Sequence, residues 1–239
     1  MIRVAAVGDV HLDPQSAGTL RPALVDAWRQ ADLLLLAGDL TRHGTPEEAR
    51  TVAAEFADLG LPVIAVLGNH DYHSDQQDEV TALLVESGIT VLEGESAVLT
   101  VDGRRVGVAG VKGFGGGFAG KCGTAFGEPE MKAFIDHTTA IARRLRQALA
   151  ELDVDVRLAL THYSPVNETL RGEPLEIYPF LGSYHLAEAI DDAECALAVH
   201  GHAHYGTEHG TTPGGVLVRN VAQPVLRAAY AVYDIEPDD

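Results

Sequence analysis

Five short apolar runs, each followed by a polar cluster, restrict the fold of this chain more than any other feature. The five runs occupy residues 4–7, 33–37, 63–67, 157–160 and 196–199. The first three are apolar throughout, which is typical of strands buried on both faces of a sheet. In a parallel α/β sheet the carboxyl ends of the strands face one edge, so these strands would deliver their polar clusters to a common place.

Helix-forming stretches lie between and after these runs. We expect helices at residues 19–31, 46–59, 75–87 and 128–150. The second has the clearest start, because Thr45 suits the N-cap, Pro46 the first position and Glu48 a capping box. Strand and helix signals therefore alternate in the first half of the chain, which favours an α/β fold.

The second half of the chain is richer in strands. Residues 96–101 and 104–110, joined by an Asp-Gly turn, predict a hairpin, and a glycine-rich loop is expected at 113–127. Further strands are expected at 156–161, 195–199, 216–221 and 226–234, the last two as an antiparallel pair. Because no linker or internal repeat is visible, we expect one domain over residues 1–239 with a mixed sheet or two sheets.

The polar clusters after the five apolar runs are rich in possible metal ligands. They are Asp9-Val10-His11, Gly38-Asp39, Gly68-Asn69-His70-Asp71, Thr161-His162 and His200-Gly201-His202-Ala203-His204. Each alone is a weak signal, because an Asp after a strand is usually a turn residue or a helix cap. The pair His202 and His204 is more specific, since alternate residues of an extended segment share a face and can grip a metal.

Taken in order, these clusters resemble the motifs of the calcineurin-like metallophosphoesterases, including single-domain bacterial members of that family. The family pattern reads D-x-H, G-D, G-N-H-[DE], an isolated H and G-H-x-H, and this chain holds every part of it between residues 4 and 204. The resemblance implies a four-layer α/β/β/α sandwich, in which two mixed sheets pack face to face with helices outside. It also implies an enzyme that hydrolyses phosphoric esters with two divalent metal ions.

The resemblance further implies a role for each matching residue. One metal would be held by Asp9, His11 and His204, the other by Asn69, His162 and His202, and Asp39 would bridge both. Manganese is expected first, with iron or zinc as alternatives, because imidazole, carboxylate and amide oxygen occur without thiolate. The set has no gap, which argues against a member that kept the fold and lost catalysis.

Physical chemistry agrees with these roles. Two metals about 3.5–4 Å apart can share a water and lower its pKa, and the resulting hydroxide can attack phosphorus in line. His70 adjoins a ligand without being one in this scheme, so it can donate a proton or a hydrogen bond to a substrate oxygen. Asp71 is expected to orient His70 and support its imidazolium, with a helix or turn cap as the alternative.

The charge of the chain bears on its partners. The formal charge is −18, from 35 acidic and 17 basic residues, and such a surface repels nucleic acid and anionic membranes. Two divalent ions would outweigh the aspartates that hold them, so the site can be positive in a negative protein. We expect a small phosphate-ester substrate and neither a nucleic-acid nor a membrane partner, with the oligomeric state left open.

The expected compartment is the cytoplasm. No apolar run approaches the roughly 20 residues that span a bilayer, and the N-terminal run is too short for a secretory signal. Only Cys122 and Cys195 occur, far apart, so a disulfide framework is not indicated and a reducing compartment is the default.

Within the family, a phosphodiesterase acting on a small or nucleotide substrate is favoured, because cyclic nucleotide phosphodiesterases share Gly-Asn-His-Asp and a similar length. Protein phosphatases usually carry Glu at the position of Asp71, and DNA-repair nucleases carry a capping domain and basic surfaces. A phosphomonoesterase or protein phosphatase is an alternative, and so is a non-catalytic metal-binding scaffold on the same fold.

Two long segments are expected near the site. Loop 113–127 matches two phosphate-loop patterns by accident, because no helix start follows it. Lys112 and Lys121 could still touch a substrate phosphate, with a solvated lysine as the default alternative. In segment 163–186, Arg171 and Tyr178 are expected to shape the substrate pocket, with an oligomer contact as the alternative. His200 is expected to be a buried histidine and not a third ligand of its cluster.

Overall fold

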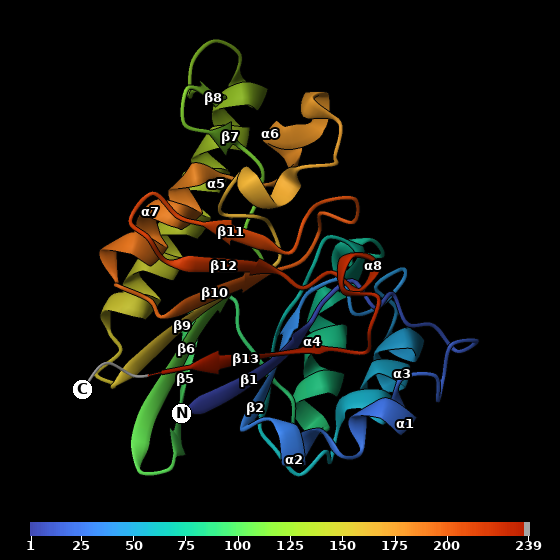
Figure 1. Ribbon diagram of the computed structural model, residues 1–239. Coiled ribbons are helices and arrows are strands. Elements are labelled where there is room, and N and C mark those ends of the chain that lie inside the picture. The colour runs from blue at the N-terminus through green and yellow to red at the C-terminus, as the bar shows by residue number, and fades with distance from the viewer. Residues whose placement is uncertain (237–239) are drawn as a thin grey trace.

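The computed structural model of the protein describes residues 1–236, and two β-sheets lie at its centre (Figure 1). The first sheet has five strands in the order β13-β1-β2-β3-β4. They are β1 (Ile2–Val7), β2 (Leu33–Ala37), β3 (Val63–Val66), β4 (Thr90–Val91) and β13 (Ala231–Ile235). β1 to β4 run parallel, and β13 pairs antiparallel with β1 at one edge.

The second sheet has six strands in the order β11-β12-β10-β9-β6-β5. They are β5 (Glu95–Val101), β6 (Arg104–Val111), β9 (Val156–Thr161), β10 (Leu197–His200), β11 (His209–Thr211) and β12 (Leu217–Asn220). The four central strands are parallel, whereas the edge strands β5 and β11 are antiparallel to their neighbours. Both sheets are therefore mixed.

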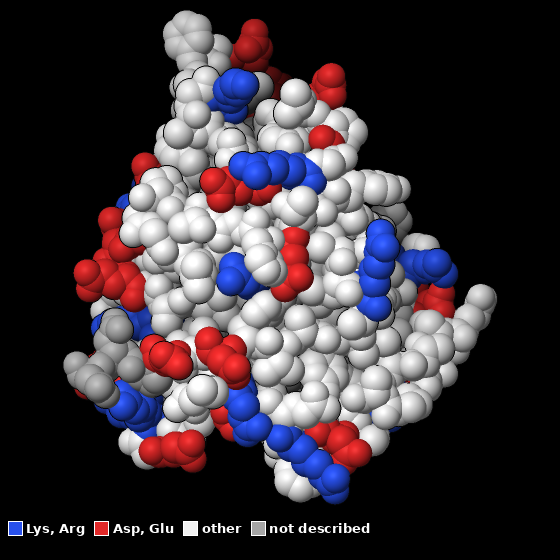
Figure 2. Space-filling model, viewed as in Figure 1, with Lys and Arg blue, Asp and Glu red and all other residues white. Residues whose placement is uncertain are grey.

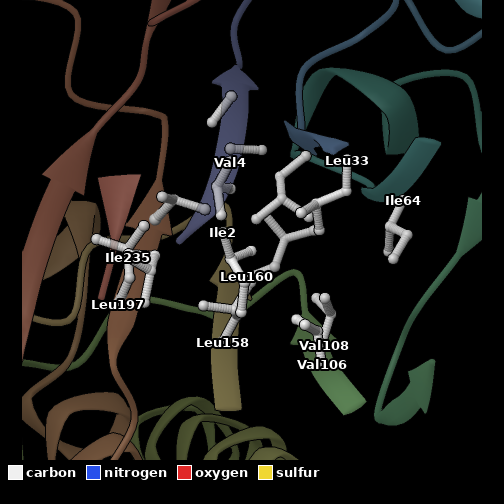
Figure 3. Packing of buried hydrophobic residues seen from close by; sticks show 14 of the residues in the cluster. Ile2, Val4, Leu33, Ile64, Val106, Val108, Leu158, Leu160, Leu197 and Ile235 are labelled. Carbon is white, nitrogen blue, oxygen red and sulfur yellow. The ribbon is translucent and has the colours of Figure 1, made fainter. Parts of the chain in front are cut away.

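The two sheets pack face to face through apolar side chains, as Figure 3 shows for part of this layer. Val4 of β1 faces the second sheet, whereas its neighbour Ala5 packs against the helices on the other side. This alternation follows from the period of two along a strand. Because both faces are covered, the strands are apolar at nearly every position, as the sequence pattern predicts.

Helices cover the outer face of each sheet (Figure 1). Those on the first sheet are α1 (Arg21–Leu24), α2 (Ala27–Gln30), α3 (Pro46–Phe56) and α4 (Gln77–Glu86). Those on the second are α5 (Pro129–Ala150) and α7 (Tyr184–Asp192). Among the described residues, no helix combines the length and the apolar character needed to cross a membrane.

The remaining elements are short. They are the pair β7 (Gly117–Phe118) and β8 (Lys121–Cys122), the 3-10 turns η1 (His70–Tyr72), η2 (Glu168–Leu170) and η3 (Leu175–Ile177), and the helices α6 (Tyr178–Leu181) and α8 (Gln223–Leu226). The loop expected at 113–127 thus holds β7 and β8. The chain is free of disulfides within this range, with Cys122 exposed and Cys195 buried.

The expected four-layer α/β/β/α sandwich of two mixed sheets is confirmed. Thr45 caps α3 in a capping box with Glu48, as predicted. The hairpin of β5 and β6 is also confirmed, and both of its turn residues, Asp102 and Gly103, have positive φ. The last three residues of the domain expected over 1–239 lie outside the described residues.

Two expectations about secondary structure are wrong, and one helix was not expected. The helix expected at 19–31 is two short helices, because the chain leaves helical geometry at Asp26, a residue type favoured just before a helix. The strands β12 and β13 do not pair; α8 carries the chain from one sheet to the other, where β13 meets β1. Helix α7 was not expected, although Ser183 caps its start.

Candidate metal centre

The loops after β1, β2, β3, β9 and β10 meet at one end of the sandwich. Backbone bonds join them: the Asp9 N–H donates to the Gly38 carbonyl (2.9 Å) and the His11 N–H to the Asp39 carbonyl (3.0 Å). The Gly201 N–H donates to the His162 carbonyl across the second sheet (3.1 Å). The convergence of strand ends expected from the sequence thus brings both sheets to one site.

One group of possible ligands surrounds Asp9. Its members each offer one donor atom, all within 4.8 Å of one another: Asp9, His11, Asp39 and His204. His204 Nε2 lies 2.8 Å from Asp9 Oδ1 and 3.4 Å from His11 Nε2. The three residues that the family resemblance assigns to one metal are therefore in contact range of a single point.

A second group adjoins the first and shares Asp39 with it. Donor atoms of Asp39, His162 and His202 lie within 4.8 Å of one another. The Asn69 amide oxygen lies 3.0 Å from His162 Nε2, which places it at the same point. Asp39 Oδ1 is 3.3 Å from His162 Nε2, whereas Oδ2 is 3.8 Å from His11 Nε2, so the carboxylate spans both groups.

The chemistry of these donors fits divalent cations. Asp9 and Asp39 are both buried, and among the described residues only histidines lie within ion-pair distance of them. Burial and the charge of Asp9 raise the pKa of Asp39 well above its usual range. Burial lowers the pKa of His11 to about 4 and that of His202 to about 3. Paired carboxylates with neutral imidazoles are the forms that bind metal.

The backbone is left-handed at four of the expected ligands. The φ angles are 55° at Asp9, 44° at His11, 50° at Asp39 and 70° at His202. This conformation is uncommon for residues other than glycine, and it gathers at functional sites, where the surrounding structure enforces it. The left-handed backbone directs these side chains away from the strands, and their donor atoms converge at the centre.

Two glycines of the motifs allow backbones to touch the aspartates. A Cβ at Gly68 would lie 2.1 Å from Asp39 Oδ1, and one at Gly201 would lie 2.2 Å from Asp9 Oδ2. Any side chain there would displace the carboxylate. The close approach of the backbone therefore requires glycine at both positions.

Hydrogen bonds fix the orientation of the ligand side chains. His162 Nδ1 lies 2.8 Å from the Ala37 carbonyl, so it donates there and leaves Nε2 free to bind a metal. The His202 backbone N–H donates to both oxygens of Asp9, at 3.0 and 2.9 Å. The Ala37 carbonyl is a backbone group, so no sequence motif indicates its role in orienting His162.

His70 lies beside the centre and is partly exposed. Its ring Nδ1 is 2.8 Å from the Arg42 carbonyl, and its Nε2 is 4.0 Å from Asp39 Oδ2. Because Nδ1–H donates to the carbonyl, Nε2 points toward the metal groups. This arrangement suits a group that hands a proton or a hydrogen bond to a substrate oxygen.

The orienting role expected for Asp71 is not supported, because the partner of His70 is the Arg42 carbonyl. Asp71 is fully buried, and its carboxylate accepts from the backbone N–H of Thr41 (2.8 Å), Gly68 (2.7 Å) and Leu40 (3.2 Å). The Thr41 hydroxyl adds a further bond of 2.6 Å. Asp71 therefore connects the loop after β3 to the loop after β2. Of the two roles expected for Asp71, this contact is closer to the turn cap.

The segments expected near the site differ in their contacts. Tyr178 donates from its hydroxyl to the Leu170 carbonyl (2.9 Å) and packs in a small apolar cluster, whereas Arg171 is exposed.

Tyr163 was not among the expected site residues, yet its ring centre lies 4.3 Å from that of His202. Its position directly after His162 was the available signal. His200 is fully buried, as expected, with Nε2 2.8 Å from the Thr169 hydroxyl.

The family profile described as calcineurin-like phosphoesterase matches residues 2–206. A Synechococcus sp. protein named "Probable cyclic nucleotide phosphodiesterase" is 40% identical over 80 residues, which is 29% of this chain and 31% of that protein. A Caenorhabditis elegans protein named as a metallophosphoesterase is 27% identical over 79% of this chain and 40% of its own length. The chain thus spans less than half the length of these two relatives.

Solved structures share the fold. The phosphopantetheinyl hydrolase of Mycobacterium tuberculosis superposes with a TM-score of 0.68 at 16% identity, covering 98% of this chain and 96% of that one. At this identity the likeness concerns the fold alone, and the family assignment rests on the profile match over most of the chain. The chain belongs to the calcineurin-like phosphoesterase family, whose members are metal-dependent hydrolases of phosphoric esters.

Proposed function

We propose that this chain is a dinuclear-metal-dependent phosphodiesterase, built as one domain, that acts on a small or nucleotide phosphate ester. The observation that carries the proposal is the sharing of Asp39 by two adjoining groups of metal donors. One carboxylate between two groups is the arrangement that a pair of close metal ions requires. The phosphodiesterase name of the Synechococcus relative supports the choice of a diester.

In this proposal every expected ligand has its place. Asp9, His11 and His204 would hold one metal, Asn69, His162 and His202 would hold the other, and Asp39 would serve both sites. When bound, the two metals supply a hydroxide at neutral pH and neutralise charge on the phosphoryl oxygens. Manganese is the first choice, with iron or zinc as alternatives, because the donors are imidazole, carboxylate and amide oxygen.

His70 acts on the substrate side of the centre. Its Nδ1–H is bound to the Arg42 carbonyl, which leaves Nε2 free for the substrate. In the imidazolium form, Nε2–H can donate to the leaving oxygen or to a phosphoryl oxygen. Asp71 acts as a positioning residue, since it holds the loops that carry Asp39 and Asn69 without touching the His70 ring. This is a different role from the one expected from the sequence.

The surface supports a small substrate. Acidic and basic side chains are interspersed on the face shown in Figure 2, and the whole chain carries a formal charge of −18. Such a surface disfavours long polyanions, which bind to continuous basic patches. The cytoplasmic location expected from the sequence stays a prediction.

The proposal is tested by stripping the metals and adding manganese back while the hydrolysis of bis(p-nitrophenyl) phosphate and p-nitrophenyl phosphate is followed. Activity should return with manganese and be higher on the diester. Asp39→Asn should abolish it, and the matched control Asp58→Asn should not, because Asp58 has the same left-handed backbone (φ 53°) in an exposed turn. A metal-loaded protein that is inactive on both esters would favour the scaffold alternative.

A further inference from the structure

Lys112 follows directly after β6 and is the one buried lysine of the chain. Its side chain is 9% exposed, whereas the other two lysines, Lys121 and Lys132, are exposed. Lysine is among the residues least often buried, and a buried one usually has an anionic partner. Its environment therefore requires an explanation.

Three aromatic rings surround the ammonium group. Lys112 Nζ lies 4.7 Å from the ring centre of Tyr72, 5.3 Å from that of Phe114 and 5.6 Å from that of Tyr163. Aromatic faces attract a cation and accept its burial. They do not accept strong hydrogen bonds, so the three N–H donors of the ammonium stay available.

No described residue pairs with this ammonium. No carboxylate lies within 4.0 Å of Nζ, and no hydrogen bond from Nζ reaches a protein acceptor within residues 1–236. Among the described residues, Gln77 Oε1 is the one side-chain N or O atom that has neither solvent contact nor a hydrogen-bond partner. Because Lys112 Nζ has no hydrogen-bond partner either, it must keep some contact with solvent. Burial lowers the pKa of Lys112 although Glu93 and Asp39 oppose the change.

The backbone of Lys112 ties it to the metal centre. Its carbonyl accepts from the N–H groups of His162 (2.9 Å) and Tyr163 (3.0 Å). The Tyr163 ring in turn lies 4.3 Å from the His202 ring and 5.6 Å from the His162 ring, centre to centre. The ammonium is therefore next to the centre, and the single ring of Tyr163 contacts both.

Helix α5 adds further nitrogen groups to the same region. The His137 ring packs edge-on against Phe114 (4.7 Å between centres), and Arg144 lies 3.8 Å from Glu93. Glu93 and Asp39 are the acids whose charges act on Lys112, and Arg144 already opposes the charge of Glu93. In a chain of net charge −18, this is a place where an anion can approach.

We propose that Lys112 binds a second anionic group of the substrate, apart from the phosphate at the metal centre, and so selects phosphate esters that carry an additional phosphate or carboxylate. The inference rests on the proposed function for the identity of the substrate. In the proposed function, the charge of the scissile phosphate would be met by two metals and by His70. The ammonium lies more than 4.0 Å from every oxygen of Asp39, the residue that both metals share.

The test compares two probes that differ by one anionic group: the p-nitrophenyl ester of thymidine 5′-phosphate, with and without a 3′-phosphate. We expect the protein to have the lower KM for the 3′-phosphorylated probe. Lys112→Met should raise that KM about tenfold, the effect of one charge-assisted hydrogen bond, and leave the other KM and both kcat values within twofold. Lys112→Arg should keep the preference, and the exposed control Lys121→Met should change nothing.

Equilibrium binding separates this inference from the proposed function. Calorimetry with thymidine 3′,5′-bisphosphate and thymidine 5′-phosphate needs no turnover, and Lys112→Met should weaken only the first. If Lys112→Met weakens only the binding of the bisphosphate but the protein hydrolyses neither probe, the proposed function is rejected and the anion site is retained. Equal losses on both ligands, or no preference in the unaltered protein, would overturn the site and leave Lys112 a structural cation.

Discussion

The backbone N–H of His70 donates a 2.8 Å hydrogen bond to Asp39 Oδ1, while the ring of the same residue points Nε2 at the other oxygen, 4.0 Å away. One residue thus fixes the carboxylate shared by both metal groups and places a proton donor beside it. The donor and the bridge cannot move independently. This link underlies the first prediction.

Replacing His70 with Ala should lower kcat by about 10²–10⁴-fold, the usual contribution of a general acid. The backbone bond to Asp39 survives the substitution, so the metal content should stay near two ions per chain. Metal analysis and steady-state kinetics on bis(p-nitrophenyl) phosphate check both statements. A parallel loss of metal would show that the ring has a structural role instead.

Replacing Asp71 with Asn should weaken metal binding about 10–100-fold through the loops that Asp71 ties together. The new amide group faces backbone N–H donors, so the free energy of unfolding should fall by about 1–3 kcal/mol. Saturating manganese should restore kcat to within twofold. A kcat that stays low at every manganese concentration would return Asp71 to the role expected from the sequence, which is to orient His70 and support its imidazolium.

Metal removal should destabilise the protein, because Asp9 and Asp39 then lie buried with only imidazoles beside them. At a manganese concentration of about 100 Kd, each site should add about 2.7 kcal/mol to the free energy of unfolding. Thermal unfolding with and without a chelator measures the effect. Asp39→Asn should lose most of it and Asp58→Asn none; an unchanged Tm on chelation would argue against a metal centre.

Gly201→Ala should reduce metal content, since its Cβ would lie 2.2 Å from Asp9 Oδ2 and push the carboxylate aside. Gly120→Ala is the control: its φ of 79° disfavours alanine, a strain that is absent at Gly201, but no atom lies within 4 Å of the added carbon. Metal analysis of the folded variants tests the prediction. Comparable losses of metal in both variants would show that the contact with Asp9 is not the cause.

The buried thiol of Cys195 should resist alkylation, because burial raises its pKa to about 12, whereas Cys122 is exposed. Thiol titration should therefore count one reactive cysteine in the native protein and two in urea. The unfolded thiol ionises above pH 9 and the folded one does not, so stability is lost as pH rises beyond 9. The stability advantage over Cys195→Ala should shrink by about 1 kcal/mol between pH 8 and pH 10.

The layers of the fold were predictable because they depend on local patterns. Buried parallel strands are apolar throughout, and the capping box at Thr45 is a short-range motif, so both can be recognised in one sequence. The partner of β13 was not predictable, because pairing between strands far apart in the chain depends on packing and not on local residues.

The site was predictable to the extent that side chains form it. All seven expected ligands are brought together, since a strand end followed by Asp or His places the side chain at the sheet edge. The sequence could not predict that the Ala37 and Arg42 carbonyls orient His162 and His70, because every residue has a backbone carbonyl. Asp71 illustrates the same limit: its partners are backbone N–H groups that no motif marks.

The pairing of β13 with β1 also governs when the protein can finish folding. The first sheet carries the loops of Asp9 and Asp39, yet its edge is completed by residues 231–235, near the end of the described chain. His204 reaches Asp9 from almost 200 positions away. Chains with such distant contacts fold slowly and late. During synthesis, the metal centre can assemble only after His204 has left the ribosome.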